Sequence, residues 1–401
     1  MNRSKLWVWL SLATGTDNGN WAKLRRHFSD AEQVYRAGAQ ELSFLGETAL
    51  FDRLLDKRLD RAEEILDVCS LKGYQILPCT SSLFPAALRE ISHSPCLLYA
   101  AGDLSLLCRP AVAVVGTRAA TSYAAMKTYS MAHSWAEAGI TVVSGMAAGI
   151  DAVAHVAALD ADGATVAVLA GGLDVVFPAS HTELHEAIRE RGLILSECPP
   201  GTPCARFRFP ARNRIVSALS DAVCVMEGKL KSGSLITARH ALEQGKQVMA
   251  MVGITGREGA EGPLQLLEMG AMPLADAADL PLATERPILS FREEMTDSEL
   301  ADMLACYGVQ LEKPKAATRR PSRRHAAVPA KRPAAPSVDL SGLSETEQRI
   351  CSALEAAGPC SADELVGNGL TISAVLTALT KLELLGVILR HPDGSYGLPT
   401  H

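Results

Sequence analysis

The sequence is poor in aromatic residues, which make up 5% of its 401 positions, although 48% of the residues are hydrophobic. The core must therefore be built mainly from Ala, Val, Leu and Ile. The composition is typical of a folded globular chain and not of a disordered one. At roughly 100–200 residues per domain, this length predicts two to three domains.

Paired cysteines are missing as well. The ten cysteines are scattered along the chain, and no two of them form a C-x-x-C pair. This spacing excludes a zinc ribbon and predicts reduced thiols that pack in apolar runs such as AVCVM, as in a cytosolic protein. We predict neither a bound metal ion nor a cofactor.

Long apolar runs are also absent. No stretch approaches the ~18 apolar residues of a membrane-spanning helix, so we expect no membrane association. The first residues, MNRSKLWVWLSLATG, leave a signal peptide open, because a charged start precedes an apolar run. Trp7, Trp9 and the polar TDNGN that follows favour an amphipathic helix and its turn. We therefore predict a cytoplasmic protein.

The net charge of −6 excludes a uniformly basic coat for nucleic acid but conceals strong local differences. Residues 313–332 hold eight Lys and Arg and no acid, whereas residues 339–401 carry −5 and residues 1–312 carry −9. The chain is thus an acidic body, a basic segment and an acidic tail. A local basic site within the body remains compatible with this distribution.

The apolar pattern changes along the chain. Residues 1 to about 70 show helical spacing, which predicts a small helical domain. Six apolar runs then alternate with helix-length segments: AVAVV (111–115), ITVVS (140–144), ATVAVLA (164–170), LILSE (193–197), DAVCVME (221–227) and KQVMAMV (246–252). This alternation predicts an α/β domain with a doubly wound parallel sheet.

The last part of the chain has a different organisation. Residues 286–338 lack an apolar period and are rich in Pro and Ala, which predicts a flexible linker. After it, the pattern predicts helices over TEQRICSALEAAG, SADELVG and TISAVLTALTKLELLG. A hairpin follows, with its turn at Pro392-Asp393-Gly394. Three helices and a hairpin are the outline of a winged helix.

Three strand-to-helix turns offer small residues where a parallel sheet holds its ligands. The first, Gly116-Thr117-Arg118, is not G-x-G-x-x-G, so a dinucleotide fingerprint is absent; Arg118 suits a phosphate or is an ordinary surface residue. The second, Ser144 to Gly149, leads into Asp151 and His155 at i, i+4. These two form either an acid–base pair or structural hydrogen bonds and caps.

The third turn and a basic segment are the remaining candidates for ligand binding. The third turn, Lys229 to Ala238, holds two lysines and places Ser232-Gly233 at a helix start, which suits an anion or simply forms a solvated loop. Residues 206–214 hold four Arg and two Phe without an acid. Arginines for phosphates and aromatic faces for bases are what single-stranded nucleic acid requires. The alternative is that Phe207 and Phe209 are core residues and the arginines are solvated.

Four motifs in this order closely resemble the DprA/Smf family: Gly116-Thr117-Arg118, SGMAAGIDAVAH (144–155), FPARNRIVSALS (209–220) and SGSLITA (232–238). The likeness covers about residues 75–275. It implies an extended Rossmann-like domain over residues 71–285, with the linker over 286–338. It also implies a small N-terminal domain of the SAM or helix-hairpin-helix type over residues 1–70 and a winged helix over 339–401.

The resemblance implies a bacterial protein that binds and protects single-stranded DNA during natural transformation. Such a protein loads the RecA recombinase, forms a homodimer and has no catalytic activity. Ser144 and Gly145 would contact phosphate through the backbone, Arg206 would hold phosphate and Phe209 would stack on a base. The full set implied for DNA is Gly116, Arg118, Ser144, Gly145, Arg206, Phe209, Arg212 and Asn213, to which the third turn adds Lys231, Ser232 and Gly233.

The sequence departs from the family pattern at a few positions. His181 and Leu264 stand where the family usually has Asn, Val252 replaces the Pro of a Pro-Gly pair, and Phe177 replaces a common Tyr. These departures concern the rim and loops of the predicted pocket and leave the fold unchanged.

The sequence also allows two other functions to be considered for parts of the chain: hydrolysis and the reading of duplex DNA. A Rossmann-like hydrolase of the phosphoribohydrolase type would need an acid or base such as Asp151, His155 or Glu197, but the P-G-G-x-G-T-x-x-E signature is absent. The winged helix could instead read duplex DNA. Its presumed recognition helix, 371–385, has Lys381 as its only basic residue, so we expect it to contact protein or to regulate the body.

Overall fold

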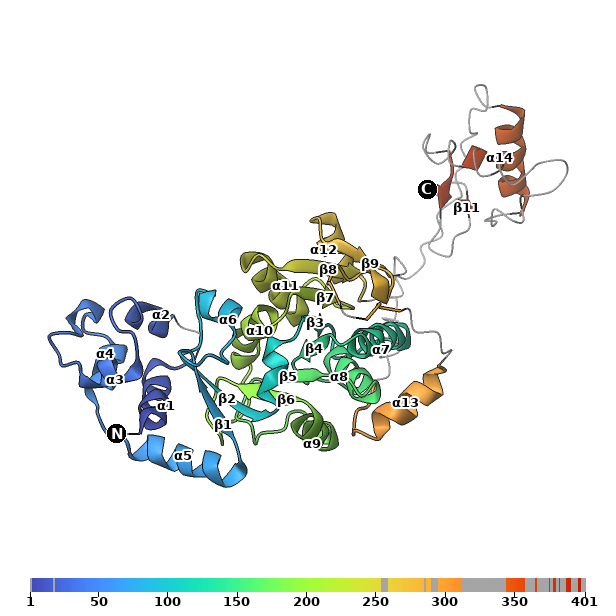
Figure 1. The fold of residues 1–401 in the computed structure, drawn as a ribbon. Coiled ribbons are helices and arrows are strands. Elements are labelled where there is room, and N and C mark those ends of the chain that lie inside the picture. The colour runs from blue at the N-terminus through green and yellow to red at the C-terminus, as the bar shows by residue number, and fades with distance from the viewer. Residues whose placement is uncertain are drawn as a thin grey trace, which may run out of the picture. The chain divides into compact units, whose positions relative to one another are not determined.

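The computed structural model describes residues 2–16, 19–253, 259–284, 286–289, 295–311 and 344–357, together with isolated positions and two short strands after residue 364. The chain divides into two units, Met1–Ala316 and Ala317–His401 (Figure 1). The helices described in the first unit are α1 (Arg3–Thr14), α2 (Asn20–Leu24), α3 (Ala31–Arg36), α4 (Ala49–Leu55), α5 (Asp60–Lys72), α6 (Ala86–Glu90), α7 (Ser122–Glu137), α8 (Ile150–Asp160), α9 (Thr182–Arg191), α10 (Arg208–Ala218), α11 (Gly233–Glu243), α12 (Glu261–Glu268) and α13 (Asp297–Ala305).

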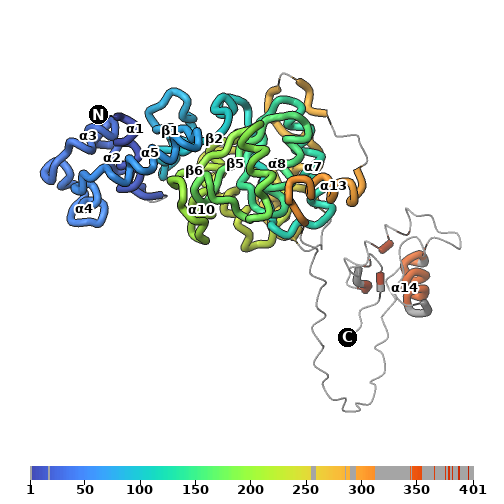
Figure 2. The backbone as a smooth tube through the Cα atoms, turned by 90° about the horizontal axis from the view of Figure 1, so that it is seen from below, coloured from blue at the N-terminus to red at the C-terminus, as the bar shows by residue number. Residues whose placement is uncertain are grey.

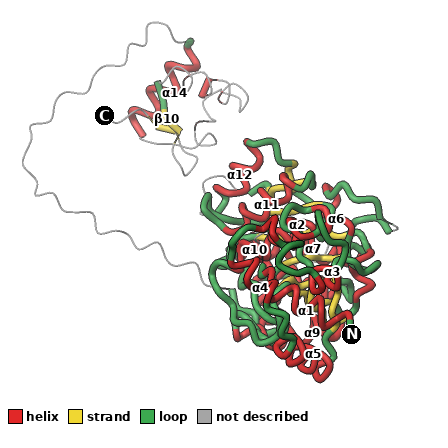
Figure 3. The backbone as a smooth tube through the Cα atoms, turned by 90° about the vertical axis from the view of Figure 1, so that its left-hand side faces the viewer, coloured by secondary structure: helices red, strands yellow, loops and turns green. Residues whose placement is uncertain are grey.

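A nine-stranded sheet forms the centre of the first unit. Its strands are β1 (Gln75–Pro78), β2 (Leu97–Gly102), β3 (Ala111–Val115), β4 (Thr141–Ser144), β5 (Thr165–Leu169), β6 (Leu193–Ser196), β7 (Ala222–Val225), β8 (Gln247–Met251) and β9 (Met272–Leu274). The six predicted strands are confirmed as β3 to β8. Every residue of β3 to β7 is buried, because helices cover both faces of the sheet (Figure 3).

The strand order, β1-β2-β6-β5-β4-β3-β7-β8-β9, is that of a doubly wound fold. Strands β3 to β9 pair in parallel, and β1 and β2 extend the sheet with antiparallel pairing. The chain proceeds from β3 outward through β4, β5 and β6 on one side. It then returns to place β7 on the other side of β3, so the order reverses between β3 and β7.

The helices form two groups, which lie on opposite sides of the sheet (Figure 1). Helix α8 packs on α7 and α9 in one group, and α10 packs on α11 in the other. Small residues allow the close approach of α7 and α8: Ala124, Ala125 and Ala132 are fully buried on α7, as are Ala154 and Ala158 on α8. This α/β architecture confirms the fold class that the apolar runs predict.

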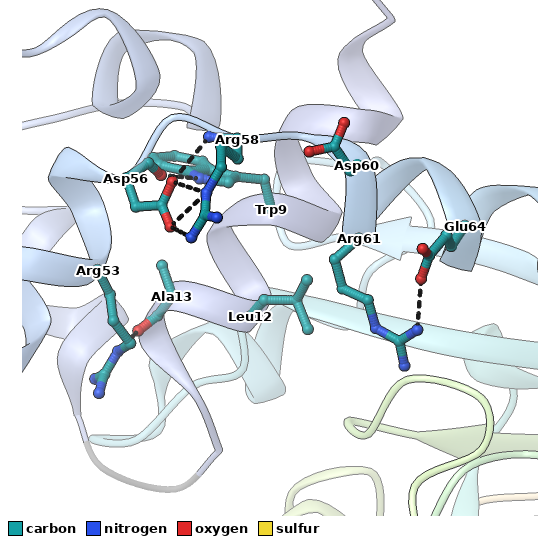
Figure 4. A pocket seen from close by; sticks show the side chains of 9 residues that line it. All are labelled: Trp9, Leu12, Ala13, Arg53, Asp56, Arg58, Asp60, Arg61 and Glu64. Carbon is teal, nitrogen blue, oxygen red and sulfur yellow. Dashed lines mark hydrogen bonds and ion pairs between the residues drawn. The ribbon is translucent and has the colours of Figure 1, made fainter.

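The N-terminal helices contain three of the four tryptophans of the chain. Trp7 packs edge-on against Trp21 at 5.5 Å between ring centroids, and Trp9 packs against Tyr35 at 5.1 Å. Helix α1 also contacts β1 and β2, so the helical region and the sheet share one hydrophobic core. A hollow of about 480 Å³ opens between α1, the end of α4 and the start of α5, with Leu12 at its centre (Figure 4).

The predicted linker begins later than residue 286. Within the range 286–338, helix α13 spans Asp297–Ala305, and Leu300, Leu304 and Val309 are buried in the core of the first unit beside α7 (Figure 2). A capping box starts the helix, in which the Thr296 side chain accepts from the Glu299 backbone and the Glu299 side chain accepts from the Thr296 backbone. The sequence Thr296-x-x-Glu299 before an apolar run was the missed signal. The basic residues 313–332 lie outside the described residues.

The second unit has its own small core. Helix α14 (Glu345–Ala357) contributes Ile350, Cys351 and Leu354 to it, and strands β10 (Leu389–Arg390) and β11 (Tyr396–Gly397) pair antiparallel. The first predicted helix and the predicted hairpin are thus confirmed. The hairpin turn at 392–394 and most of the helices predicted over 361–367 and 371–386 lie outside the described residues. Across the part of the chain that is described, no helix has the length and hydropathy to cross a membrane.

Candidate nucleic-acid interface

A pocket of about 420 Å³ opens at the carboxyl ends of β3 and β7, where the strand order reverses. Open α/β sheets bind their ligands at this point. The loops after β3, β4 and β7 and the first turns of α8, α10 and α11 contribute the walls. The lining residues are Val115, Gly116, Thr117, Arg118, Ala147, Asp151, Phe209, Arg212, Asn213, Lys229, Lys231, Ser232, Gly233, Ser234 and Thr237.

The turn after β3 requires a glycine at its first position. A Cβ on Gly116 would lie 2.5 Å from Cγ1 of Ile150, the first residue of α8. The Thr117 amide donates to the Glu227 carbonyl, and the Thr117 carbonyl accepts from the Ile150 amide. These contacts join the turn after β3 to the ends of β7 and α8. They present the exposed Arg118 at the rim of the pocket.

An aromatic platform borders Arg118. The guanidinium carbon of Arg118 lies 4.8 Å from the centroid of the Phe209 ring, and Phe177 packs edge-on against the same ring at 5.5 Å. Phe207 is 68% exposed and lies beneath the Arg208 guanidinium, outside the pocket lining. Of the two alternatives for the aromatic residues of this segment, a buried core position is therefore wrong for Phe207.

Arg212 forms the floor of the pocket and is 6% exposed. Its Nη1 donates to the Val168 carbonyl at 2.5 Å, and its Nε donates to Asn213 Oδ1 at 3.1 Å. The guanidinium lies directly against Gly145, where any Cβ would overlap it. The small residue of the second turn therefore makes room for an arginine side chain from α10.

Asp151 is the one carboxylate among the residues that line this pocket. Its Oδ2 lies 4.0 Å from Arg212 Nη2. Burial raises the pKa of Asp151, and the positive charge of Arg212 opposes that shift. Burial also lowers the pKa of Arg212, with Asp151 opposing, although a guanidinium stays protonated in proteins. Because the two charged groups are 4.0 Å apart, Asp151 offsets only part of the positive charge that Arg212 presents to the pocket.

The third turn supplies a helix N-terminus to the same pocket. Ser232 is the N-cap of α11, and its side chain accepts from the Ser234 amide at 3.2 Å. Asn213 Nδ2 donates to the Gly233 carbonyl at 3.2 Å, which joins α10 to the start of α11. Lys229 and Lys231 are exposed beside this N-terminus. Backbone N–H groups, the helix dipole and two lysines together suit a phosphate.

The structure brings most of the predicted residues together. Eight of the eleven line the pocket: Gly116, Arg118, Phe209, Arg212, Asn213, Lys231, Ser232 and Gly233. Ser144 and Gly145 lie buried beneath it, and the Ser144 hydroxyl donates to the Val114 carbonyl at 2.6 Å. Arg206 is exposed before α10, outside the lining.

The four arginines of residues 206–214 differ in their surroundings and do not form one basic surface. Arg214 is 3% exposed, and its Nη2 contacts both carboxylate oxygens of Glu197 at 2.7 and 2.8 Å. Arg208 Nη1 donates to the Pro203 carbonyl. Two of the four arginines are therefore engaged by the protein itself, away from the pocket.

Lys229 lines the pocket and was not among the predicted contacts. Its position two residues before Lys231, in a turn that follows a buried strand, was the available signal.

The acid–base groups of the hydrolase alternative have separate partners in the structure. Asp151 faces Arg212 and Glu197 binds Arg214, whereas the His155 Nδ1 lies 2.7 Å from Thr165 Oγ1 in the core. Burial lowers the pKa of His155 to about 3. His155 therefore has the structural role that was one of its two alternatives. Within the described ranges, no group of three or more His, Cys, Asp or Glu side chains could hold a metal ion.

Three of the four departures from the family pattern are not among the lining residues or their aromatic neighbours, whereas Phe177 packs against Phe209 at the rim. His181 is buried, with its Nδ1 3.2 Å from the Met146 carbonyl in the second turn. Leu264 on α12 and Val252 after β8 are 42% and 44% exposed.

The fold and pocket define a Rossmann-like protein with a pocket at its switch point that is lined by basic residues. Residues 75–284, just over half of the chain, match the family model described as DNA recombination-mediator protein A, and residues 329–394 match the DprA winged helix domain. The chain belongs to this DprA/Smf family.

Several members of the family are similar over long stretches. Protein Smf of Synechocystis is 32% identical, with 97% of each chain covered. The DNA processing protein DprA of Bacillus subtilis is 39% identical over 52% of this chain and 71% of its own length. The X-ray structure of DprA from Streptococcus pneumoniae matches with a TM-score of 0.62 at 31% identity, covering 70% of this chain and 98% of that one.

Proposed function

We propose that the switch-point pocket binds single-stranded DNA without catalysing a reaction. The observation that carries this proposal is the grouping of Arg118, Lys229 and Lys231 around the exposed end of α11, with the Phe209 ring at the same rim. Cations beside an aromatic face are the combination that a single strand requires, since phosphates and unpaired bases alternate along it.

The pocket supports a single strand better than a duplex. Its volume of about 420 Å³ and its half-buried aromatic wall fit one or two nucleotides whose bases are free to stack. The remaining body is acidic, with −9 over residues 1–312, so indiscriminate binding along a duplex is disfavoured by charge repulsion. The exposed Arg206 would hold the phosphate next to the Phe209 position.

By analogy with the DNA processing proteins that it resembles, we further propose that the chain acts in natural transformation in the cytoplasm. It would protect incoming single strands and help to load the RecA recombinase onto them, and it would work as a homodimer. Co-purification of the recombinase with the full chain, in the presence and absence of oligo-dT, tests the recombinase contact. Sedimentation of the full chain tests the dimer.

The DNA contact is tested by titrating the full chain with oligo-dT at several salt concentrations. Contacts from Arg118, Arg206, Lys229 and Lys231 predict a slope of log affinity against log salt near −3, at about −0.7 for each phosphate. A slope near zero would contradict the proposal. The Lys229→Ala/Lys231→Ala variant should reduce the magnitude of the slope by about 1.4. Lys246→Ala, a lysine at the other end of α11, is the matched control.

A further inference from the structure

A second basic surface lies on the N-terminal helices, outside the switch-point pocket. Lys23, Arg25, Arg26 and His27 are all exposed, and the five positions from 23 to 27 hold no carboxylate. Helix α2 ends at Leu24, and the buried Trp21 and Leu24 attach it to the core. The cations are therefore held on a packed element of the fold.

Among the described residues, Lys23, Arg25 and Arg26 lack the carboxylate partners that other surface cations of the N-terminal helices have. Arg58, for example, contacts Asp56 through two nitrogens in the hollow between α1, α4 and α5 (Figure 4). Among the residues that the structure describes, no carboxylate lies within 4.0 Å of the charged nitrogens of Lys23, Arg25 or Arg26. Their charge is thus available to an external anion.

An aromatic stack borders the same cations. The rings of His27 and Phe44 lie 3.9 Å apart between centroids, with an angle of 28° between their planes. Phe44 is 40% exposed, so part of its ring is open to solvent. Cations next to an exposed aromatic ring form a second instance of the combination found at the switch-point pocket.

Helix α6 connects this surface to the pocket. Arg25 Nη1 donates to the Arg89 carbonyl on α6 at 2.6 Å, and α6 in turn contacts α10. Figure 1 shows α6 between α2 and α10. Arg206, which lies outside the pocket lining, precedes α10 on the chain.

We propose that the α2 surface, consisting of Lys23, Arg25, Arg26, His27 and Phe44, binds the stretch of single-stranded DNA that leaves the switch-point pocket. This inference rests on the proposed function of the pocket and adds a second contact region on the N-terminal helices. The cations would neutralise phosphates, and the Phe44 ring would accept a base. Short oligonucleotides would fill the pocket only, whereas longer ones would also reach α2.

The test compares two lengths of oligo-dT on the full chain. One has about 6 nucleotides, within the ~4–16 that a single-strand site covers, and the other about 25. The variant Lys23→Ala/Arg25→Ala/Arg26→Ala should reduce the magnitude of the salt slope by about 2 for the longer oligonucleotide and leave the shorter one unchanged. Phe44→Leu should weaken the longer one by about fivefold or more, with an unchanged slope.

A matched control removes three cations that already have carboxylate partners, in the variant Arg36→Ala/Arg58→Ala/Arg61→Ala. If both triple variants change the slope equally, or if neither changes it, the α2 surface does not contact DNA. Lys23→Gln/Arg26→Gln keeps the hydrogen bond of Arg25 to α6 and should still reduce the slope by about 1.4, should the triple variant fail to fold. Failure of the pocket itself is recognised separately, because the parent would then not bind the short oligonucleotide.

Discussion

The floor and the rim of the switch-point pocket use the same residue types in different environments. On the floor, Arg212 is buried against Gly145, donates to the Val168 carbonyl and faces Asp151. At the rim, Arg118 is exposed and contacts only an aromatic face among the interactions described. A buried, hydrogen-bonded charge is part of the fold, whereas an exposed charge is free to bind a ligand. Floor substitutions should therefore reduce stability, and rim substitutions should reduce affinity.

The largest effect is expected from an arginine near the pocket that is not part of it. Arg214→Ala removes the ion pair with Glu197, whose side chain is only 13% exposed, so the free energy of unfolding should fall by about 3–5 kcal/mol. Urea denaturation measures this change. At concentrations where the variant is folded, its salt slope with oligo-dT should equal that of the parent. A reduced slope would show that Arg214 contacts DNA and not only Glu197.

Gly145→Ala tests the floor directly. The added Cβ would overlap the Arg212 guanidinium and displace it from the Val168 carbonyl. Loss of this buried, charged hydrogen bond should lower the free energy of unfolding by about 2 kcal/mol. Gly233→Ala is the control, because a Cβ there meets nothing within 4 Å and should change stability by no more than about 0.5 kcal/mol. Equal stability of the two variants would contradict the packing described for Arg212.

Phe209→Ala tests the rim. Loss of the ring should weaken oligo-dT binding by about 1–3 kcal/mol, as for other base-stacking residues. Fluorescence anisotropy with labelled oligo-dT measures the change. Phe207→Ala, which removes a ring outside the pocket lining, should have a smaller effect. The platform at Phe209 would be excluded if the two substitutions weakened binding equally.

The last prediction concerns the pH dependence of stability and rests on His155, which lies in the core. Burial lowers its pKa to about 3, below the ~6.5 of an unfolded histidine, so the unfolded chain binds the extra proton between these values. Stability should therefore fall as the pH drops through that window, by up to about 1.4 kcal/mol per pH unit from this group. His155→Gln should flatten the dependence of unfolding on pH between about 6 and 4. If the pH dependence of unfolding were unchanged in His155→Gln, a group other than His155 would cause it.

The sequence alone was sufficient to predict β3 to β8, the strands that form the centre of the sheet. Buried parallel strands need apolar residues on both faces, so runs such as Ala111–Val115 and Thr165–Leu169 are recognisable without knowledge of their neighbours. Strands β1, β2 and β9 were missed. The short strands β1 and β9 are partly exposed, whereas β2 is a buried apolar run that precedes the alternating series beginning at residue 111. Helix α13 was missed because its capping box stands within a segment that otherwise resembles a linker.

The candidate site was only partly predictable. Small residues at the ends of β3, β4 and β7 identified the three turns, since a close backbone approach requires them. The sequence could not show that Gly145 makes room for Arg212 and not for a ligand, because the two are far apart along the chain.

By itself, the sequence determined the doubly wound sheet, the three turns and the residue types that favour a single strand, because local apolar runs and small residues are properties of neighbouring positions. Only the tertiary structure decided which charges face the pocket. Arg212 and Arg214 are two residues apart on α10, yet one meets Val168 and Asp151 while the other meets Glu197. The partner of a buried charge comes from a distant segment, so its role is fixed by packing.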